Sequence, residues 1–398
     1  IKIFIMNKID FKNIKKQCVK NIDFLNNHNF KNDQIFTFVF NIGDNFRIDN
    51  ILNNSNIYKN DPICFLNKDF QSIGIVKEKE FIFSNPKEFD SVQSSVLKLI
   101  SNSKFVNKKS NLDKTFIFGG YNFSLDQKNK GIWRSVPNGA FVLPRYIFFK
   151  SHIIINLFLP RNAKNISNDI IFQYIEELRL IIKNNTIDKQ SSLEKIEDIN
   201  KDKYLHNLES CINTINGKNN KLNKVVLSRI KKISFTDNIS RGPILNSLYK
   251  RNNNNMNFLF SYNDNISIVG SSPELIISLN NNIIKSESLA GSNYNKKNDE
   301  FILDAKEIKE QKIVTNYILQ YFNRNATNIV FNRKPFVKKS FNMDHLCTEI
   351  SGFVDNDKNI FSLLNEIHPT PAIAGEPKKS AINYIIKNEV RGWYGGPI

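Results

Sequence analysis

Two glutamates in the stretch KEIKEQKIV at 306–314 have a spacing that suits a metal ion. Glu307 and Glu310 lie three residues apart in a stretch with helical character, so both carboxylates can face the same way. Carboxylate oxygens are the ligands that hard cations such as Mg²⁺ prefer. A solvated helix face is the alternative, and the spacing alone leaves both interpretations open.

Small residues in SLAGSN at 288–293 indicate a second kind of site. Backbone N–H groups that no large side chain shields, as near Gly291 and Ser292, can cradle a carboxylate. Lys224 leads the apolar run VVL, and Glu274 follows the bend Gly-Ser-Ser-Pro, so each can present a charge at the end of a strand. Taken singly, each is more often a surface lysine or a turn glutamate.

Two further segments combine a histidine with small or polar residues, HLCTEISG at 345–352 and HPTPAIAGEP at 368–377. The second holds three prolines, two alanines and a glycine in ten residues, which describes a backbone held in one shape. This segment stands out in a chain written mostly in Asn, Lys, Ile and Phe. A lone histidine is more often structural than catalytic, so the segment by itself decides neither role.

Composition excludes several classes of function. The 398 residues carry a net charge of +18, but the lysines are spread evenly without a basic stripe, so no nucleic-acid partner is expected. The four cysteines form no CxxC pair, which argues against a zinc ribbon and fits reduced thiols. No window approaches the roughly 18 apolar residues of a membrane span. We expect a cytoplasmic monomer without a membrane partner.

The apolar patterns predict long helices beside antiparallel hairpins. Strands are predicted at 36–40, 81–84, 116–123, 141–149, 225–230, around 329 and at 345–354, with hairpins about the turns 263–265 and 280–282. Helices are predicted at 168–184, 191–217, 300–323 and 376–391. The second of these helices would start with a capping box of Ser191 and Glu194 and stop at Gly217.

This arrangement indicates an α+β fold of large antiparallel sheets layered with helices, rather than a doubly wound parallel sheet. No shift in composition resembles a linker. We therefore predict one large domain, with a variable scaffold part at 1–115 and the region that carries the motifs at 116–398.

The order of the motifs carries a resemblance that no single motif does. KVVLSR, GSSPEL, LAGS, the KE and EQ pairs, HLCTEISG, HPTPAIAGEP and NEVRGWYGG follow one another as they do in chorismate-binding enzymes. FGGYNF and FVLPRY look like the weaker upstream motifs of this family. The resemblance covers roughly residues 115–398, is strongest from 223 onward, and implies chorismate as the ligand.

The resemblance implies a role for each candidate residue. Lys224 resembles the general base that activates water, a role that requires burial or a cationic neighbour to favour the neutral amine. Glu274 resembles the general acid that protonates the leaving 4-hydroxyl, and Glu310 resembles a ligand of Mg²⁺. The residues that would bind substrate are Gly291, Ser292, Thr348 and His368.

A lysine at the position of Lys224 is typical of relatives that add water to chorismate, whereas relatives that take ammonia usually have another residue there. The expected function is an Mg²⁺-dependent isochorismate synthase, an isomerase that adds water at C2 and releases the C4 hydroxyl, in menaquinone or siderophore biosynthesis. A salicylate synthase is the nearest alternative. The large subunit of anthranilate or aminodeoxychorismate synthase and an inactive scaffold protein are others.

Two departures from the family pattern accompany the resemblance. Gln311 stands where many relatives have histidine after the metal glutamate, a change that we expect to be mild. Family members continue past the YGG motif into strands and a helix that supply an arginine, a glycine-rich cradle, a second metal glutamate and a lysine. This sequence ends at Ile398 and begins without Met, so the resemblance implies a C-terminally truncated fragment with little turnover of its own.

Overall fold

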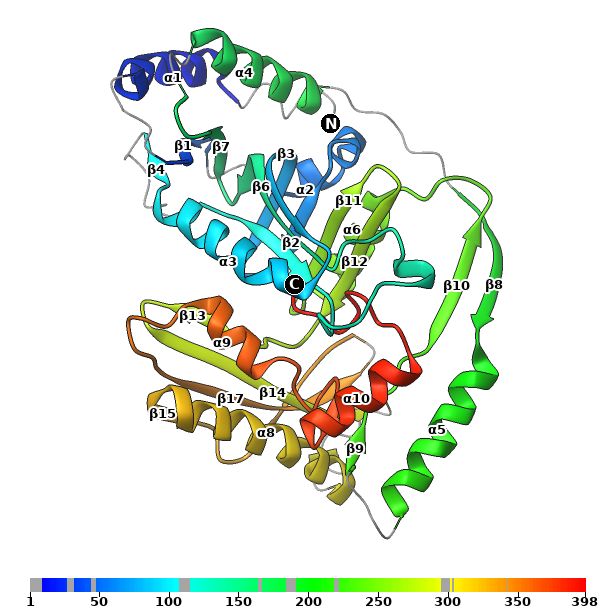
Figure 1. Cartoon of the computed structure of the whole chain (residues 1–398). Helices are drawn as coiled ribbons and strands as arrows, with labels where there is room; N and C mark the ends of the chain where they lie inside the picture. Colours follow the sequence, from blue (N-terminus) through cyan, green and yellow to red (C-terminus); the bar gives the residue numbers. More distant parts are fainter. Residues whose placement is uncertain are drawn as a thin grey trace. The chain divides into compact units, whose positions relative to one another are not determined.

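The computed structural model divides into two compact units (Figure 1). Unit 1 comprises Ile1–Gly119, Gly139–Ser191 and Asp237–Ser271, and unit 2 comprises Gly120–Asn138, Ser192–Thr236 and Ser272–Ile398. The structure describes residues 9–26, 32–43, 48–106, 115–163, 167–183, 191–217, 222–294, 301–302, 304–341 and 343–398. Because segments of the two units alternate along the chain, neither unit coincides with the predicted parts at 1–115 and 116–398, and that division stays a prediction.

Unit 1 is built, in its described residues, on a nine-stranded sheet in the order β12-β11-β2-β3-β6-β7-β1-β4, with β5 paired to β6. The successive pairs from β11 to β1 are antiparallel, whereas the short β4 joins β1 in parallel. The strands are β1 Gln34–Asn41, β2 Ile63–Leu66, β3 Gln71–Phe83, β4 Lys104–Phe105, β5 Phe118–Tyr121, β6 Gly139–Phe149, β7 His152–Leu159, β11 Met256–Asn263 and β12 Ile266–Ser272. The predicted upstream strands and the hairpin about 263–265 are confirmed.

Helices cover both faces of this sheet. They are α1 Phe11–Asn26, α2 Ile48–Leu52, η2 Ser55–Lys59, α3 Pro86–Ser101, α4 Asn168–Lys183 and α6 Arg241–Arg251. In β1, Phe36 packs into the core cluster of α1 and α4, whereas its neighbour Ile35 packs with Leu99 of α3. Successive residues of a strand point to opposite faces, so the unbroken burial of β1 follows from helices on both sides.

Unit 2 contains a second sheet, in the order β13-β14-β17-β15 with β16 on β17. The strands are β13 Ser278–Asn280, β14 Ile283–Asn293, β15 Thr327–Phe331, β16 Phe336–Lys338 and β17 Asp344–Phe353, and the helices α8 Ala305–Asn325 and α9 Ile360–Ile367 pack on one face. Val314 and Ile318 of α8 meet Ile284 and Ile350 of the sheet in this core. The predicted α+β fold, the hairpin at 280–282 and the long helix are confirmed.

Two small ribbons complete unit 2. Strand β9 (Lys224–Val225) pairs with β18 (Gly375–Glu376), and β8 (Leu193–Ile199) pairs with β10 (Ile230–Phe235). The helices beside them are α5 Lys201–Asn216 and α10 Lys378–Asn388. The α10 helix confirms the helix predicted at 376–391, although it starts at Lys378, with Pro377 as its N-cap residue, and ends at Asn388.

Two predictions in this part of the chain were wrong in detail. The predicted helix from Ser191 begins only at Lys201, because residues 193–199 pair with β10 as a strand; Glu194 therefore forms no capping box. The predicted strand at 225–230 is interrupted after Val225, and its continuation starts at Ile230. In both places pairing with a segment distant in sequence overrides the local pattern.

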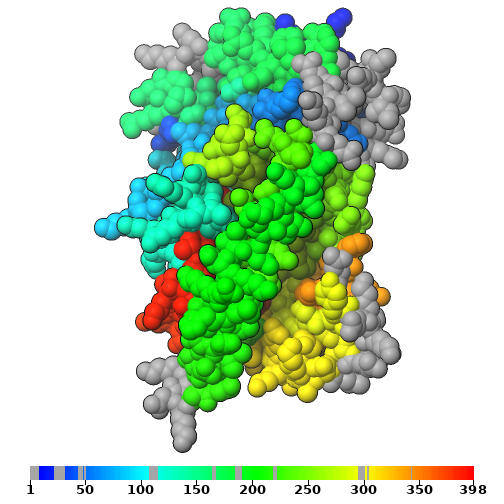
Figure 2. Space-filling model, turned by 90° about the vertical axis from the view of Figure 1, so that its right-hand side faces the viewer, coloured from blue at the N-terminus to red at the C-terminus, as the bar shows by residue number. Residues whose placement is uncertain are grey.

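The α5 helix and the β8–β10 ribbon lie at the surface of unit 2, where Figure 2 shows them in green. Their apolar side chains are poorly covered: Leu205 and Ile212 on α5 and Ile196 on β8 are 43%, 48% and 56% exposed.

In the part of the chain that the structure describes, no helix has the length and apolar character to cross a membrane.

Candidate active site

The HPTPAIAGEP segment lies against the strand that carries Lys224. In the β9–β18 ribbon Lys224 is paired with Glu376 and Val225 with Gly375, and the N–H of Asn223 donates to the carbonyl of Glu376 at 2.7 Å. A Cβ atom on Gly375, which has φ +140°, would lie only 2.0 Å from the carbonyl oxygen of Lys224. Glycine at this point therefore permits the close approach that positions Lys224.

The side chain of Lys224 reaches the predicted metal ligand. Its Nζ lies 3.1 Å from Oε1 of Glu310, and the two side chains are 14% and 35% exposed. The Nζ is buried and makes no hydrogen bond of good geometry. The Lys224 side chain beside Glu310 shows that this carboxylate, although 35% exposed, can receive a cation.

Arg391, a buried residue of the NEVRGWYGG motif, ties three motifs together. Its guanidinium donates to the carbonyl of Ile373 at 2.6 Å and to the carbonyl of Val226, and Nε donates to Glu389 at 2.7 Å. The other carboxylate oxygen of Glu389 accepts from the N–H and the hydroxyl of Ser228. The segment that follows Lys224 is thus fixed to the HPTPAIAGEP segment and to the first residues of the NEVRGWYGG motif.

Hydrogen bonds to the two residues that flank Glu274 in the chain fix its position. The carbonyl of Pro273 accepts a hydrogen bond from Lys338 Nζ at 2.8 Å, and the carbonyl of Leu275 accepts from the N–H of Glu287 at 3.0 Å. Lys338 also forms an ion pair with the carboxylate of Glu287. Strands β14 and β16 therefore hold the segment that presents Glu274.

The carboxyl of Glu274 has an environment that favours its protonated form. Burial raises its pKa to about 7, and the nearby carboxylate of Glu287 acts in the same direction. A hydrogen bond from the Thr370 hydroxyl to Oε1, at 3.3 Å, and the charges of Lys224 and Lys338 act against this rise. Glu274 can therefore carry a proton near neutral pH and still lies within the electrostatic reach of Lys224.

The predicted carboxylate cradle at LAGS already holds a carboxylate of the protein. The N–H of Ser292 donates to Oε2 of Glu307 at 2.8 Å, and Gly291, at φ +75°, lets this bend pass close to the helix that bears Glu307. Lys306 pairs with the other oxygen of Glu307. The two glutamates of the KEIKE stretch thus differ, since Glu307 supports the bend while Glu310 meets Lys224.

Thr348 and Gln311 form a buried polar pair between β17 and α8. Gln311 Nε2 donates to the carbonyl of Ser288 at 2.9 Å and to the Thr348 hydroxyl oxygen at 3.3 Å. Gln311 Oε1 is buried without a hydrogen-bond partner. Because Thr348 accepts from Gln311, its own hydroxyl proton is directed elsewhere. Gln311, expected from the sequence to be a mild departure from the family pattern, thus contacts the predicted substrate-binding residue Thr348, a contact that the sequence did not predict.

His368 is buried at the end of α9. Its hydrogen bond and its ring contacts involve residues other than Lys224 and Glu310. Its Nε2 lies 3.0 Å from the carbonyl oxygen of Phe123, which requires a proton on Nε2, while Nδ1 is buried without a partner. The ring meets those of Tyr121 and Phe123 edge-on. Burial lowers the pKa of His368 to about 4, so the ring is neutral at physiological pH.

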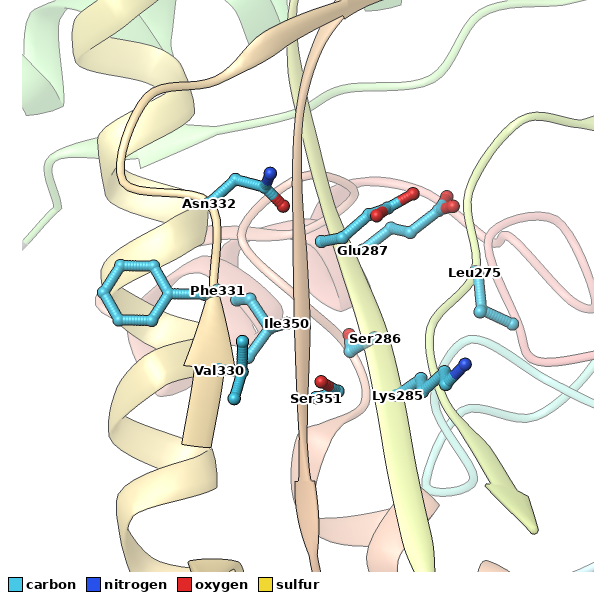
Figure 3. Close-up of a pocket in the computed structure, with 10 residues that line it drawn as sticks. Leu275, Lys285, Ser286, Glu287, Val330, Phe331, Asn332, Ile350 and Ser351 are labelled. Atoms are coloured by element: carbon cyan, nitrogen blue, oxygen red, sulfur yellow. The ribbon is translucent and has the colours of Figure 1, made fainter. Parts of the chain in front are cut away.

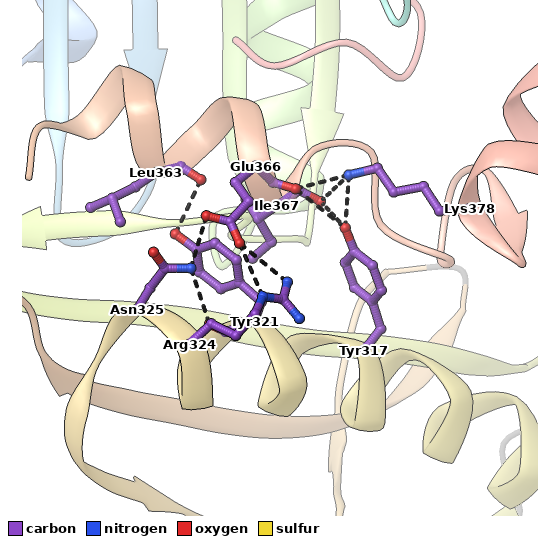
Figure 4. A network of polar contacts seen from close by, with 8 residues as sticks. All are labelled: Tyr317, Tyr321, Arg324, Asn325, Leu363, Glu366, Ile367 and Lys378. Carbon is purple, nitrogen blue, oxygen red and sulfur yellow. Dashed lines mark hydrogen bonds and ion pairs between the residues drawn. The ribbon is translucent and has the colours of Figure 1, made fainter.

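A polar network fixes the end of α9 from which His368 and Thr370 follow (Figure 4). Lys378 Nζ donates to the hydroxyl of Tyr317 at 2.8 Å and to the carbonyl of Glu366 at 2.9 Å, and Tyr317 donates to the carbonyl of Ile367. The remaining members are Tyr321, Arg324, Asn325 and Leu363. Burial lowers the pKa of Lys378 to about 8. Three helices therefore anchor the rigid segment.

A cavity of about 330 Å³ lies beside β14 and β17, with Glu287 among its lining residues (Figure 3). Glu287 of β14 is paired with Glu349 of β17. The next residue of β17, Ile350, packs in the core between the sheet and α8, so the two glutamates point to the opposite face of the sheet. No predicted site residue lines this cavity. It borders the Glu274 segment only through Leu275 and Glu287.

The candidate site is therefore a set of linked pairs within unit 2: Lys224 with Glu310, Glu274 with Thr370, Ser292 with Glu307, and Thr348 with Gln311. Thr370, Gln311, Lys338 and Arg391 received no role from the sequence. Among the residues described, no three His, Cys, Asp or Glu side chains gather as a ready-made metal site. One carboxylate still suits Mg²⁺, which commonly completes its coordination with water and substrate oxygens.

A sequence model described as chorismate binding enzyme matches residues 18–398. The chain belongs to the chorismate-binding enzyme family. Isochorismate synthase MenF of Bacillus subtilis is 27% identical to it over 297 residues, which cover 71% of this chain and 62% of that protein. The vibriobactin-specific isochorismate synthase of Vibrio cholerae is 29% identical over 188 residues, or 44% and 48% of the two chains. The matched region thus spans about half to three fifths of these relatives' length.

Solved structures of chorismate-binding enzymes share the fold. MenF of Escherichia coli, described as a menaquinone-specific isochorismate synthase, superimposes with a TM-score of 0.69 over 96% of this chain and 86% of its own, at 18% identity. Anthranilate synthase component I from Streptococcus pneumoniae gives a TM-score of 0.62 over 86% and 78%, at 17% identity. At these identities the likeness concerns the fold alone, which an isochorismate synthase and an anthranilate synthase component have in common.

Proposed function

We propose that this chorismate-binding enzyme is an isochorismate synthase. The observation that carries the proposal is the presence in unit 2 of two groups that influence each other electrostatically: the buried Nζ of Lys224, which makes no hydrogen bond, and the carboxyl of Glu274, whose pKa is raised to about 7. Such a pair suits a reaction that takes a proton from water and gives one to a leaving hydroxyl. The curated relatives named above carry isochorismate synthase in their names, which supports the same reaction.

In the proposed reaction the amine of Lys224 takes a proton from water as the water oxygen bonds to C2 of chorismate. The ring double bond shifts, the bond between C4 and its hydroxyl oxygen breaks, and Glu274 protonates that oxygen so that water leaves. Atoms balance, because one water enters and one departs. The direct proton acceptor and donor are thus both residues of this chain.

Mg²⁺ is proposed as the cofactor, with Glu310 as a ligand. The fit rests on the half-buried Glu310 carboxylate, which already receives the Lys224 ammonium at 3.1 Å. When bound, Mg²⁺ would neutralise the substrate carboxylate. The Thr348 hydroxyl and the LAGS bend are proposed to contact the substrate.

The test is product analysis in ¹⁸O-labelled water with purified protein, chorismate and Mg²⁺. We expect isochorismate with ¹⁸O at C2, and loss of product in the Lys224→Ala and Glu274→Gln variants. Lys231→Ala and Glu209→Gln change exposed residues of the same types and serve as matched controls. Salicylate with pyruvate would identify a salicylate synthase instead, and bound but unconverted chorismate would leave only a binding protein.

A further inference from the structure

Thr370 is the residue of HPTPAIAGEP that touches the proposed acid. Its side chain is 1% exposed, and its hydroxyl donates to Glu274 Oε1 at 3.3 Å. The N–H groups of Ile373 and Ala374 both donate to its carbonyl, at 3.2 and 3.0 Å, and prolines stand on either side of it. These contacts and the two prolines constrain the backbone of Thr370, so the hydroxyl has little freedom to turn toward another acceptor.

The position of this hydroxyl has a chemical consequence for Glu274. In a protonated carboxyl group the oxygen without the proton is the better hydrogen-bond acceptor. A donor held at Oε1 therefore favours the form that carries its proton on Oε2. We propose that Thr370 is a positioning residue that directs the acid proton of Glu274 to Oε2, the oxygen that Thr370 does not contact.

This inference rests on the proposed role of Glu274 as general acid. In that step the O–H bond at Oε2 breaks and its proton joins the departing C4 hydroxyl oxygen, which keeps the electron pair of the C–O bond. The carboxylate that remains still accepts from Thr370 at Oε1. The backbone of Glu274, fixed through Pro273 by Lys338, then needs no movement during the transfer.

The charged groups around Glu274 set the direction of a pH effect. Glu287 on β14 raises its pKa, whereas Lys224 on β9, Lys338 on β16 and the hydrogen bond from Thr370 lower it. Removing the Thr370 hydroxyl therefore raises the pKa of Glu274. Because the acid acts in its protonated form, the decline of kcat on the alkaline side should move to higher pH, by about half a unit for one hydrogen bond.

The experiment compares Thr370→Val with Thr370→Ser in the full chain. Thr370→Val should lower kcat about three- to tenfold at the optimum with KM nearly unchanged, and should shift the alkaline decline upward. Thr370→Ser, which keeps the hydroxyl, should restore both. Thr327→Val, in β15, removes an exposed hydroxyl that donates to the carbonyl of Phe353 and serves as the matched control.

Infrared titration gives a readout that does not need turnover. The carbonyl stretch of the protonated Glu274 carboxyl, assigned by its loss in Glu274→Gln, should titrate at higher pH in Thr370→Val than in the wild type. That shift supports the proposal even if the protein converts no chorismate, an outcome that would overturn only the proposed function. An unchanged titration, or an active Thr370→Val enzyme with wild-type kcat and pH profile, overturns the role of Thr370.

Discussion

Two groups of charged residues in this protein are built in opposite ways, and one of them lies in unit 1. There Arg145 donates to Glu78 at 2.7 Å and to Glu177 at 2.9 Å. The hydroxyls of Tyr146 and Tyr174 donate to the same two carboxylates, and so does a backbone N–H to Glu78. Each of the three charged side chains is therefore paired with at least one opposite charge of the same cluster.

The candidate site in unit 2 keeps unused bonding capacity. Lys224 Nζ, Gln311 Oε1 and His368 Nδ1 are buried without hydrogen bonds, although Lys224 lies near the carboxylate of Glu310. Leaving a buried polar atom unsatisfied costs about 1–3 kcal/mol, so such atoms call for an explanation. Buried polar atoms without a hydrogen bond also occur in unit 1, at Asp61 and Ser72 for example, so such an atom alone does not mark a binding site. The comparison teaches a narrower point: the charges around Arg145 are paired with one another, whereas Lys224 has, among the residues described, only the carboxylate of Glu310 beside it.

The largest effect that would sharpen this contrast concerns Lys224. Lys224→Met should reduce isochorismate formation by about 10²–10⁴-fold, because the attacking water loses its base. The unfolding free energy should change little, since no hydrogen bond is lost and the half-buried Glu310 can be solvated. Steady-state kinetics measure the loss of isochorismate formation, and urea unfolding measures the free energy of unfolding. A large loss of stability with normal kcat would place Lys224 among the structural charges.

Arg145→Met should show the reverse behaviour. Removing the guanidinium leaves Glu78, whose side chain is 4% exposed, without its compensating charge, and breaking a buried pair in this way costs about 3–5 kcal/mol. Urea unfolding should reveal that loss, while kcat per folded molecule stays unchanged. Wild-type stability in this variant would refute a structural role for the ion pairs of Arg145 with Glu78 and Glu177.

Glu310 and Glu307 provide a finer test within one helix. Glu310→Gln should raise the Mg²⁺ concentration for half-maximal activity on the order of tenfold, because a hard cation loses a charged ligand. Glu307→Gln should change this concentration less, since its carboxylate already serves Ser292 and Lys306. Titration of activity with Mg²⁺ measures both. Equal shifts would mean that the two carboxylates act together.

The smallest effect concerns His368 and pH. The folded protein keeps this ring neutral down to about pH 4, whereas the unfolded chain takes up a proton near the ordinary pKa of 6.5. Stability is therefore complete above pH 6.5 and is lost as pH falls toward 4, by roughly 1 kcal/mol at pH 5.5. His368→Asn, which cannot titrate, should lose correspondingly less between pH 7 and 5.5 in urea unfolding. Parallel losses would contradict the burial of an uncharged ring.

Much of this protein is readable from residues close together in sequence. The hairpins about 263–265 and 280–282 and the helix predicted at 168–184 follow local patterns of turn residues and apolar spacing, and the structure has them. The pattern failed at 193–199, where apolar and charged residues suited either a helix or a strand. This segment forms the strand β8 because it pairs with β10, which lies more than thirty residues later in the chain. Local propensity cannot foresee a partner that distant.

The sequence by itself determined the family, because seven ordered motifs record a chemistry that needs particular side chains, and it named Lys224, Glu274 and Glu310 as candidates. Only the tertiary structure decided how those motifs support one another. It set Gly375 against the carbonyl of Lys224 and Thr370 against Glu274. Hydrogen bonds and close approaches depend on distances of a few ångströms between segments that are 96 residues apart in one case and 151 in the other. Such distances are consequences of packing, which no local pattern of residue types encodes.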